Sequence, residues 1–372
     1  MRYETEQAQV RRVLIYRLGS IGDTVVALPA IRLVARAFPE AERRVLTNFS
    51  TEVKAAPLES VLEGTGLLHS YMRYPLGERN IGTLYKLRSE IRNWGPDVLV
   101  YLAAPRGRMK AVRDLLFFRS CGIGKMIGIP LSHDSQGPRQ IDGARLYESE
   151  ASRLARGIRA LGDAQLQDPA SWGLALTSEE IRKAEKIVGN WSGRGRFIAA
   201  SIGTKADTKD WGVENWRSLF SSVSRSHPGF GLVTIGAANE RAASDIAADA
   251  WSGPKLNLCG NLKPRESAAV IQRSVMFIGH DSGPMHLAAA VNIPCVAVFS
   301  ARNRPGEWFP YGTNNQVIYH QTDCFGCQLV KCEVHQKKCI RSITVDEVRA
   351  AVAHTLRNRL GLSKHAMSEL QR

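Results

Sequence analysis

The sequence has no long apolar run, and its first residues are polar. Although 44% of its 372 residues are hydrophobic, the most apolar segment, residues 291–301, is interrupted by Asn292 and Pro294. A membrane-spanning helix needs about 20 consecutive apolar residues. The first seven residues carry acids, and the first apolar run starts at Val13, whereas a secretory signal peptide joins a basic start to an apolar stretch. We therefore expect a cytoplasmic protein without a transmembrane span.

Two common nucleotide-binding motifs are also missing. The loop after the first expected strand holds only Gly19 and Gly22, so it lacks the GxGxxG fingerprint of dinucleotide-binding domains, and no Gly-Lys-Ser/Thr P-loop occurs. This absence disfavours an NAD-type oxidoreductase, which stays an alternative because the strand and helix pattern described below would suit one.

Acidic residues are too few to balance the basic ones. The chain has 50 Lys and Arg against 35 Asp and Glu, a net charge of +15, which suggests an acidic substrate, an anionic membrane face or nucleic acid as partner. One stretch holds six basic residues and only the acid Asp114, namely Arg106, Arg108, Lys110, Arg113, Arg119 and Lys125. Only Phe117 and Phe118 lie there to stack on bases, so the stretch is a poor single-strand platform. A solvated basic face is the simpler interpretation.

Strand and helix patterns alternate along the chain. In the first half, apolar runs at 13–16, 45–47 and 97–102 alternate with helical patterns at 25–38 and 81–94; after the turn-rich segment 162–173, apolar runs recur at 197–200, 231–236, 275–278 and 295–299. Such alternation predicts α/β architecture with parallel, doubly wound sheets, and the length exceeds what one core usually serves. We expect two Rossmann-like domains facing a cleft, residues 1–165 and 174–350, followed by a C-terminal helix and tail at 351–372.

A carboxylate follows the first strand. Asp23 lies where open α/β sheets place their ligands. It could cap the Thr24–Phe38 helix, a position that aspartate favours, or act as a general base. Both interpretations stay open on the residues alone.

The segment 279–290, Gly-His-Asp-Ser-Gly-Pro-Met-His-Leu-Ala-Ala-Ala, places polar side chains where a strand becomes a helix. Asp281 or Ser282 suits the N-cap, and Pro284 is tolerated in a first helical turn. The free N–H groups of that turn favour an anionic ligand. An ordinary capped helix is the alternative.

Two further loops follow strands of the second half. Thr204, Lys205 and Lys209 come after the 197–200 run and can hold a diphosphate by charge and hydrogen bonds, although lysines also serve solubility. Glu240 comes after the 231–236 run, where a carboxylate can accept hydrogen bonds from ribose hydroxyls. An exposed glutamate at a helix start is the alternative.

Four cysteines gather near the C-terminal end, with His335 among them: Cys324, Cys327, Cys332 and Cys339. Such a set can form a tetrahedral zinc site. However, the second pair is not Cys-x2-Cys, and a reducing cytoplasm also permits free thiols. A structural zinc ion and free thiols both remain possible interpretations of the cysteines. A basic, zinc-containing nucleic-acid-binding protein therefore stays a third alternative for the function.

Taken in order, these motifs resemble those of glycosyltransferase family 9, the bacterial heptosyltransferases that add heptose to the inner core of lipopolysaccharide. The most specific parts are Leu-Gly-Ser-Ile-Gly-Asp at 18–23, Lys209-Asp210-Trp211 with Trp216, and Asp-Ser-Gly-Pro-Met-His-Leu-Ala at 281–288. The resemblance implies a GT-B fold with an N-terminal acceptor domain and a C-terminal nucleotide-sugar domain. It also implies inverting, metal-independent transfer from ADP-heptose to a Kdo or heptose acceptor.

The resemblance further implies residue roles. Asp23 is the expected base, and the expected donor-binding residues are Thr204, Lys209, Glu240, Asp281, Ser282, Gly283 and His286. We assign the acceptor to Gly22, Arg106, Arg108 and Lys110. No cofactor is expected for catalysis, and the expected partners are ADP-heptose and an acidic lipid-linked oligosaccharide at the anionic inner face of the inner membrane, without nucleic acid. Because Lys205, Ala206 and Asp207 depart from the family pattern, transfer of another nucleotide sugar stays an alternative.

Overall fold

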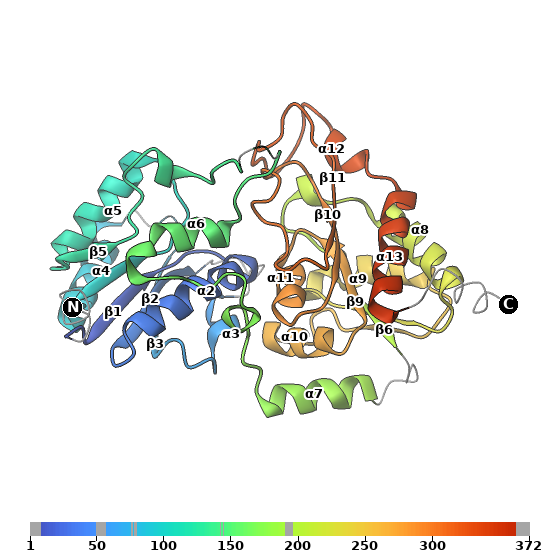
Figure 1. The fold of residues 1–372 in the computed structure, drawn as a ribbon, viewed down its shortest axis with the longest axis horizontal. Helices are drawn as coiled ribbons and strands as arrows, with labels where there is room; N and C mark the ends of the chain where they lie inside the picture. The colour runs from blue at the N-terminus through green and yellow to red at the C-terminus, as the bar shows by residue number, and fades with distance from the viewer. Residues whose placement is uncertain are drawn as a thin grey trace. The chain divides into compact units, whose positions relative to one another are not determined.

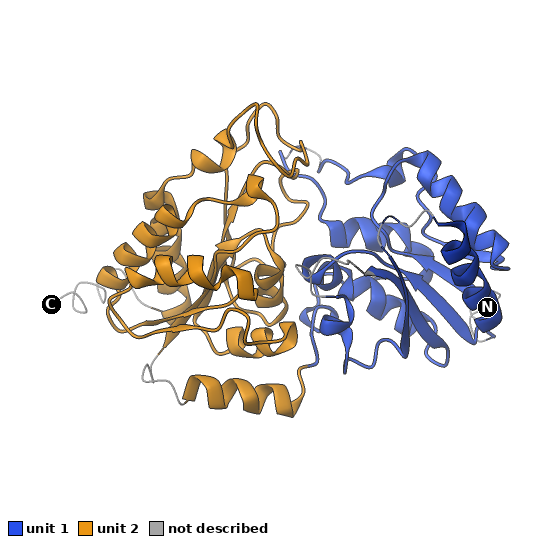
Figure 2. Cartoon of the chain, turned by 180° about the vertical axis from the view of Figure 1, so that it is seen from behind, with its two compact units in different colours: residues 1–175 blue, residues 176–372 orange. Residues whose placement is uncertain are grey.

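The chain folds into two compact units. The computed structural model describes residues 9–49, 57–75, 77, 80–141, 143, 145–189 and 196–361. Unit 1 is Met1–Ala175 and unit 2 is Leu176–Arg372 (Figure 2). Each unit contains one parallel sheet flanked by helices (Figure 1), so the α/β class with two parallel sheets is confirmed.

The sheet of unit 1 has the strand order β3-β2-β1-β4-β5. Its strands are β1 (Arg12–Tyr16), β2 (Glu42–Phe49), β3 (Ser70–Pro75), β4 (Val98–Tyr101) and β5 (Lys125–Ile127). Its helices are α2 (Ile21–Ala37), α3 (Glu59–Leu62), α4 (Ile81–Trp94), α5 (Arg108–Ser120) and α6 (Glu150–Gly157), with short 3-10 helices η1 (Asp134–Gln136), η2 (Arg159–Leu161) and η3 (Pro169–Ser171). The central strands β1 and β4 are buried on both faces, as parallel strands covered by helices require.

The turn-rich segment 162–173, which separates the two expected sets of strands, packs on unit 1. Arg32 of α2 donates to the Gly173 carbonyl over 2.6 Å, and Arg36 donates to the Asp163 carbonyl over 2.9 Å. Trp172 is buried. These contacts hold the segment on α2, and the units divide after Ala175.

The sheet of unit 2 has the order β11-β10-β9-β6-β7-β8. Its strands are β6 (Phe197–Ser201), β7 (Gly231–Thr234), β8 (Lys255–Asn257), β9 (Met276–His280), β10 (Cys295–Phe299) and β11 (Gln316–Tyr319). Its helices are α7 (Ser178–Gly189), α8 (Val213–Ser226), α9 (Arg241–Asp249), α10 (Pro264–Gln272), α11 (Gly283–Ala290), α12 (Lys338–Arg341) and α13 (Val345–Leu360), with η4 (Asp207–Lys209) and η5 (Ala238–Glu240). All strand pairs are parallel, so the carboxyl ends of β6, β7 and β9 lie at one edge.

The C-terminal helix α13 belongs to the core of unit 2. It begins at Val345, six residues before the expected start at 351, because Thr344 caps it by accepting a hydrogen bond from the Glu347 N–H. Val348, Val352 and Leu356 are buried against α8 and β10. Residues 362–372 of the expected tail lie outside the described residues.

Within the described ranges, no helix combines the length and the apolar character needed to cross a bilayer.

Candidate functional site

The polar turn after β9 has the expected form. β9 ends at His280, and α11 begins at Gly283 with Ser282 as its N-cap in an extended conformation and Pro284 in its first turn. The helix starts four residues before the apolar run at Leu287 because Gly283 and Pro284 belong to its first turn. The hydroxyl of Ser282 is buried and has no hydrogen-bond partner among the described residues. A buried hydroxyl left without a partner beside the N–H groups of a first helical turn suits an anionic ligand.

Lys209 and Asp281 form an ion pair between two neighbouring strand ends. Lys209 follows β6 in η4, and its Nζ lies 2.6 Å from Asp281 Oδ2 and 3.1 Å from the Asp281 carbonyl oxygen. Asp281 Oδ2 also accepts a hydrogen bond from Asn303 Nδ2 at 3.0 Å. Asp281 is buried, and the lysine side chain is mostly so. The sequence had not pointed to Asn303, which lies in the loop after β10; only the pairing of β9 with β10 brings it there.

His280 ties this strand end to the loop that carries Lys209. Its Nε2 accepts hydrogen bonds from the Trp211 backbone N–H at 3.1 Å and from the Trp216 indole at 3.3 Å. Burial lowers the pKa of His280 to about 4, so the ring is neutral and both bonds persist at neutral pH. The motif had contained His280 without a role, and the structure gives it a positioning one.

Glu240 lies over two glycines at the ends of β6 and β7. Its carboxylate accepts a hydrogen bond from the Ala237 N–H at 2.8 Å. A Cβ built on Gly203 would lie 1.9 Å from this carboxyl carbon, and one on Gly236 would lie 2.2 Å from its Oε2. Burial raises the pKa of Glu240. The side chain is therefore only half exposed, and the backbone beneath it has to be glycine.

The remaining expected donor residues lie nearby without forming one hydrogen-bonded cluster. Thr204 bonds within its own loop, to the backbone of Ala206 at 3.3 and 3.4 Å. His286 is buried in α11, with its ring edge-on to Trp308 at 6.2 Å between centroids. Gly283 is the first residue of α11. The structure thus joins Lys209 and Asp281 directly and sets the others at the ends of β6, β7 and β9.

In unit 1, Asp23 stands in the first turn of α2. The helix begins at Ile21 with Ser20 as its N-cap, so the prediction that Asp23 caps a helix starting at Thr24 was wrong. Asp23 instead occupies the third helical position, where its Oδ2 accepts hydrogen bonds from the Ser20 N–H at 2.9 Å and the Ser20 hydroxyl at 3.3 Å. Because the Ser20 side chain in turn faces the Asp23 backbone N–H, the two residues form a capping box. About a third of the carboxylate side chain is exposed, at 34%.

A buried arginine holds the strand end beside Asp23. Arg17 donates to the carbonyls of Leu102 and Asp23, its Nη2 lies 4.0 Å from Asp23 Oδ1, and its Nη1 lies 3.3 Å from Glu150 Oε1. Burial acts to raise the pKa of Glu150, but the hydrogen bond and charge of Arg153, with the charge of Arg17, leave that pKa below its usual value. Sequence reasoning missed Arg17, whose only signal was a charge directly after a buried strand.

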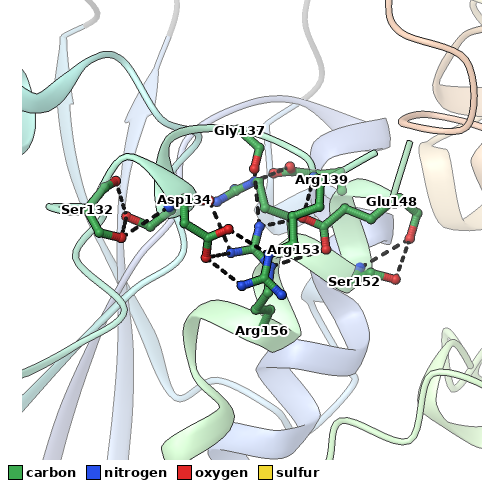
Figure 3. Close-up of polar contacts among 11 residues, drawn as sticks. Ser132, Asp134, Gly137, Arg139, Glu148, Ser152, Arg153 and Arg156 are labelled. Carbon is green, nitrogen blue, oxygen red and sulfur yellow. Dashed lines mark hydrogen bonds and ion pairs between the residues drawn. The ribbon is translucent and has the colours of Figure 1, made fainter. Parts of the chain in front are cut away.

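The segment before α6 is clamped to that helix by ion pairs (Figure 3). Arg156 of α6 bonds to Glu148 and lies 3.2 Å from Asp134 Oδ2. Arg139 binds both oxygens of Asp134 at 2.6 Å. These arginines are therefore neutralised within unit 1 and tie Asp134 and Glu148 to α6.

The residues assigned to the acceptor differ in their surroundings. Arg106 is held by Asp114 Oδ2 at 2.6 Å and by the Tyr16 hydroxyl at 3.2 Å, whereas Arg108 and Lys110 are exposed on α5. Gly22 lies in the first turn of α2. The acceptor assignment stays a prediction.

The four clustered cysteines and His335 border one cavity, together with Thr208, Ala301, Arg302, Lys337 and Lys338. All four thiols are free. Across the described ranges, no three His, Cys, Asp or Glu side chains converge as ligands of a metal ion. The cysteines are neighbours without forming a preorganised metal site.

Comparison with known proteins agrees with these features. The family glycosyltransferase family 9 (heptosyltransferase) matches residues 158–338. Lipooligosaccharide heptosyltransferase 2 of Campylobacter jejuni is 24% identical over 185 residues, covering 48% of this chain and 53% of that protein. The chain thus spans about half the length of this curated relative.

Two solved structures share the fold. A family 9 glycosyltransferase from Veillonella parvula superposes with a TM-score of 0.71 at 17% identity, covering 94% of this chain and 98% of that one. The E. coli ADP-heptose lipopolysaccharide heptosyltransferase II gives 0.66 at 18% identity, covering 94% and 99%. Both show that the two parallel sheets form a GT-B fold. With the family match over residues 158–338 and the motifs at 18–23, 209–211 and 281–288, the chain is similar to glycosyltransferase family 9.

Proposed function

We propose that the protein is an inverting, metal-independent glycosyltransferase that moves heptose from ADP-heptose to a Kdo or heptose residue of the lipopolysaccharide inner core. The observation that carries the proposal is the strand edge of unit 2. There the Ser282 hydroxyl, which has no partner among the described residues, lies at the start of α11, and the Lys209–Asp281 pair joins the ends of β6 and β9. Glu240 follows the neighbouring strand β7.

In this proposal the α11 N-terminus binds the donor's diphosphate. Lys209 has three N–H donors, and Asp281 accepts two of them through its side chain and its backbone. One donor is left for a phosphate oxygen. Because the pair is nearly neutral overall, most of the anion recognition falls to the Ser282 hydroxyl and the helix N–H groups.

The other unit 2 residues hold the nucleoside and the sugar. Glu240 accepts hydrogen bonds from the ribose hydroxyls, since the hydrogen bond from the Ala237 N–H anchors its Oε2 and, among the described residues, its Oε1 has no such anchor. Asp281 and His286 contact the sugar. This placement keeps the negative Asp281 carboxylate away from the negative diphosphate, which it would repel. The Ser282 hydroxyl, the helix N–H groups and Lys209 stabilise the negative charge of the leaving diphosphate, which lowers the barrier to displacement.

Asp23 acts as the base that removes the acceptor's proton. Ser20 fixes Oδ2 through two hydrogen bonds, and Oδ1 remains to accept a proton, with the Arg17 guanidinium 4.0 Å away. An inverting displacement needs one such base. Arg17 positions the turn through its bond to the Asp23 carbonyl.

Transfer of heptose to a deacylated core acceptor tests this function. We expect Asp23→Asn to lower kcat by about 10²–10⁴-fold, the usual contribution of a general base, while the thermal stabilisation by ADP is retained. Ser20→Ala is the matched control, because it removes one bond to the same carboxylate and keeps the base. Full activity of Asp23→Ala would exclude Asp23 as the base, and retention of the anomeric configuration would exclude inversion.

The nucleotide is tested by thermal shift with ADP, UDP, GDP, ADP-heptose and NAD. ADP and ADP-heptose should raise the melting temperature, because a ligand bound only by the native state stabilises it. Stabilisation by UDP or GDP instead would support transfer of another nucleotide sugar. Stabilisation by NAD alone would support an oxidoreductase.

We further propose that catalysis needs no cofactor and that a zinc ion, where bound, is structural and held by Cys324, Cys327, Cys332 and Cys339. The cavity that they share supports this location. Activity that survives chelation by EDTA supports the first statement, and loss of activity that Mg²⁺ restores would contradict it.

The proposed location is the cytoplasm, at the inner face of the inner membrane, where the acidic lipid-linked acceptor is found. The net charge of +15 supports an anionic surface as partner. We propose no nucleic-acid partner, and the absence of duplex or single-strand binding at moderate salt checks this.

A further inference from the structure

One helix of unit 1 exposes a row of apolar side chains. On α5, Met109 is 88% exposed, Val112 is 44% exposed and Leu116 is 62% exposed. Their spacing of three and four residues puts them on one side of the helix. We call these three residues the apolar stripe. The opposite side of α5 carries Ala111, Asp114 and Phe118, which are buried.

Basic residues border the apolar stripe on both sides. At 3.6 residues per turn, Arg108 and Arg119 lie along one side, and Lys110 and Arg113 lie along the other. All four are exposed, and we call them the basic rim. Because Arg113 is paired with Asp114, the net positive charge of the rim comes from Arg108, Lys110 and Arg119. The only acid of the helix, Asp114, is buried and paired with Arg106 and Arg113. The exposed side of α5 is therefore apolar at its centre and positive at its edges.

We propose that α5 docks on a bilayer that carries anionic headgroups, lying in the plane of its surface. The apolar stripe enters the boundary between headgroups and acyl chains, and the basic rim contacts the phosphates. Long basic side chains reach the headgroups while their stems cover apolar surface. The charge of the rim, without an exposed acid, favours anionic lipid over a second copy of this strongly basic chain.

This inference deepens the membrane partner proposed above by naming the element that makes the contact. It rests on the proposed function only for the nature of the acceptor. Vesicle binding is measured without donor or acceptor, so it stands or falls separately from heptose transfer.

The test is flotation of the full chain with vesicles of phosphatidylcholine, alone or mixed with phosphatidylglycerol. We expect binding to the mixed vesicles that weakens as salt rises, because surface charges are screened within about 10 Å at 0.1 M salt. The double variant Met109→Ser/Leu116→Ser should bind the vesicles at least about tenfold more weakly than the wild type, since both changes remove apolar area that the bilayer would bury. The triple variant Arg108→Gln/Lys110→Gln/Arg119→Gln should lose the preference for phosphatidylglycerol.

The matched control is Ile246→Ser on α9, an exposed apolar residue at 52% that lies beside the acid Asp245. It should bind vesicles like the wild type. Equal binding by the wild type and the Met109→Ser/Leu116→Ser variant would overturn the proposal. So would a wild-type dimer that this variant converts to a monomer, since the stripe would then join two copies.

Transfer activity separates the two proposals. With a deacylated, water-soluble acceptor, Met109→Ser/Leu116→Ser should keep the wild-type kcat/KM, and with the acceptor embedded in anionic vesicles it should fall. A protein that binds vesicles but transfers no heptose would refute the proposed function and leave the docking helix standing. A protein that transfers heptose but ignores the vesicles would do the reverse.

Discussion

Lys209 and Asp281 meet at the ends of two neighbouring strands, β6 and β9, with 2.6 Å between Nζ and Oδ2. The pair joins a residue of the lysine loop to a residue of the turn before α11, so each of the two loops sets the position of the other. Asn303 provides the second hydrogen bond to the same carboxylate oxygen. In the proposed function, donor binding and local stability are therefore linked through one buried carboxylate.

Replacing the lysine should separate these two effects. We expect Lys209→Met to weaken the donor's apparent affinity about tenfold or more, because a charge-assisted hydrogen bond contributes about 1.5–3 kcal/mol. The variant should also lose stability, because it leaves the Asp281 carboxylate buried without a cation. Isothermal titration with ADP and urea unfolding measure the two effects.

The double variant Lys209→Met/Asp281→Asn should regain stability without regaining donor affinity. Lys337→Met is the control, since Lys337 pairs with Asp207 Oδ1 at 3.0 Å in the same part of unit 2. If it weakens ADP binding as much as Lys209→Met does, the effect is a general loss of positive charge.

Adding a methyl group beneath Glu240 should displace its carboxylate. We expect Gly203→Ala to weaken ADP binding about tenfold, the cost of a lost hydrogen bond to a charged group, because the new Cβ would lie 1.9 Å from the Glu240 carboxyl carbon. Gly229→Ala is the control, because its Cβ would meet nothing within 4 Å. That change should leave ADP binding intact and leave stability equal or slightly higher. Unchanged ADP binding in Gly203→Ala would show that Glu240 does not contact the nucleoside.

The buried His280 should make the protein less stable in acid. In the folded chain its pKa is about 4, against the ordinary 6.5 of an unfolded histidine. Between these pH values the unfolded chain binds the additional proton, so the free energy of unfolding falls as the pH falls from 6.5 to 4. The full effect of one proton is about 1.4 kcal/mol per pH unit.

His280→Gln should lose this part of the pH dependence, while its amide oxygen can still accept from Trp211 or Trp216. Urea unfolding of both proteins across that pH range measures the difference, and subtraction removes the contributions that both proteins share, including that of His227, whose pKa is also lowered by burial. Parallel pH profiles would mean that His280 titrates equally in both states.

The clustered cysteines should carry free thiols in the protein as purified without added zinc. No three of the described His, Cys, Asp or Glu side chains converge as metal ligands, and Cys327 is exposed. We expect zinc well below one ion per chain by elemental analysis, and we expect the exposed Cys327 to be modified by a thiol reagent in the native protein. One zinc per chain with protected thiols would contradict this and would mean that the ion draws the four side chains together.

Local sequence patterns predicted much of the structure at the carboxyl ends of the strands in unit 2. The strand and turn around Asp281, and the helix start at Ser282, depend on apolar runs, a proline and a capping residue within a dozen positions. The structure differs where distant residues decide. Asn303 reaches Asp281 only through the pairing of β9 with β10, and no local motif marks it.

The start of α2 shows a subtler limit. Asp23 and Ser20 are both good capping residues, so the apolar pattern from Val25 suggested a late start. Gly19 adopts a φ of +125°, which a side chain rarely adopts, and this turns the chain early enough for Ser20 to cap. The same capping box then fixes the carboxylate expected to be catalytic, a geometry that residue spacing alone does not specify.

Arg17 is almost wholly enclosed, at 1% exposed, and its acidic partner Glu150 lies 133 residues further along the chain. On the ribosome, β1 is made long before α6, and until Glu150 emerges the guanidinium has only the partly exposed Asp23 carboxylate, 4.0 Å away, and lacks its buried acidic partner. Burying a charge without its partner is strongly unfavourable. Unit 1 should therefore stay incompletely folded during most of its synthesis and complete its folding late. A nascent chain that stops before α6 should therefore be sensitive to proteases even though it contains every strand of the first sheet.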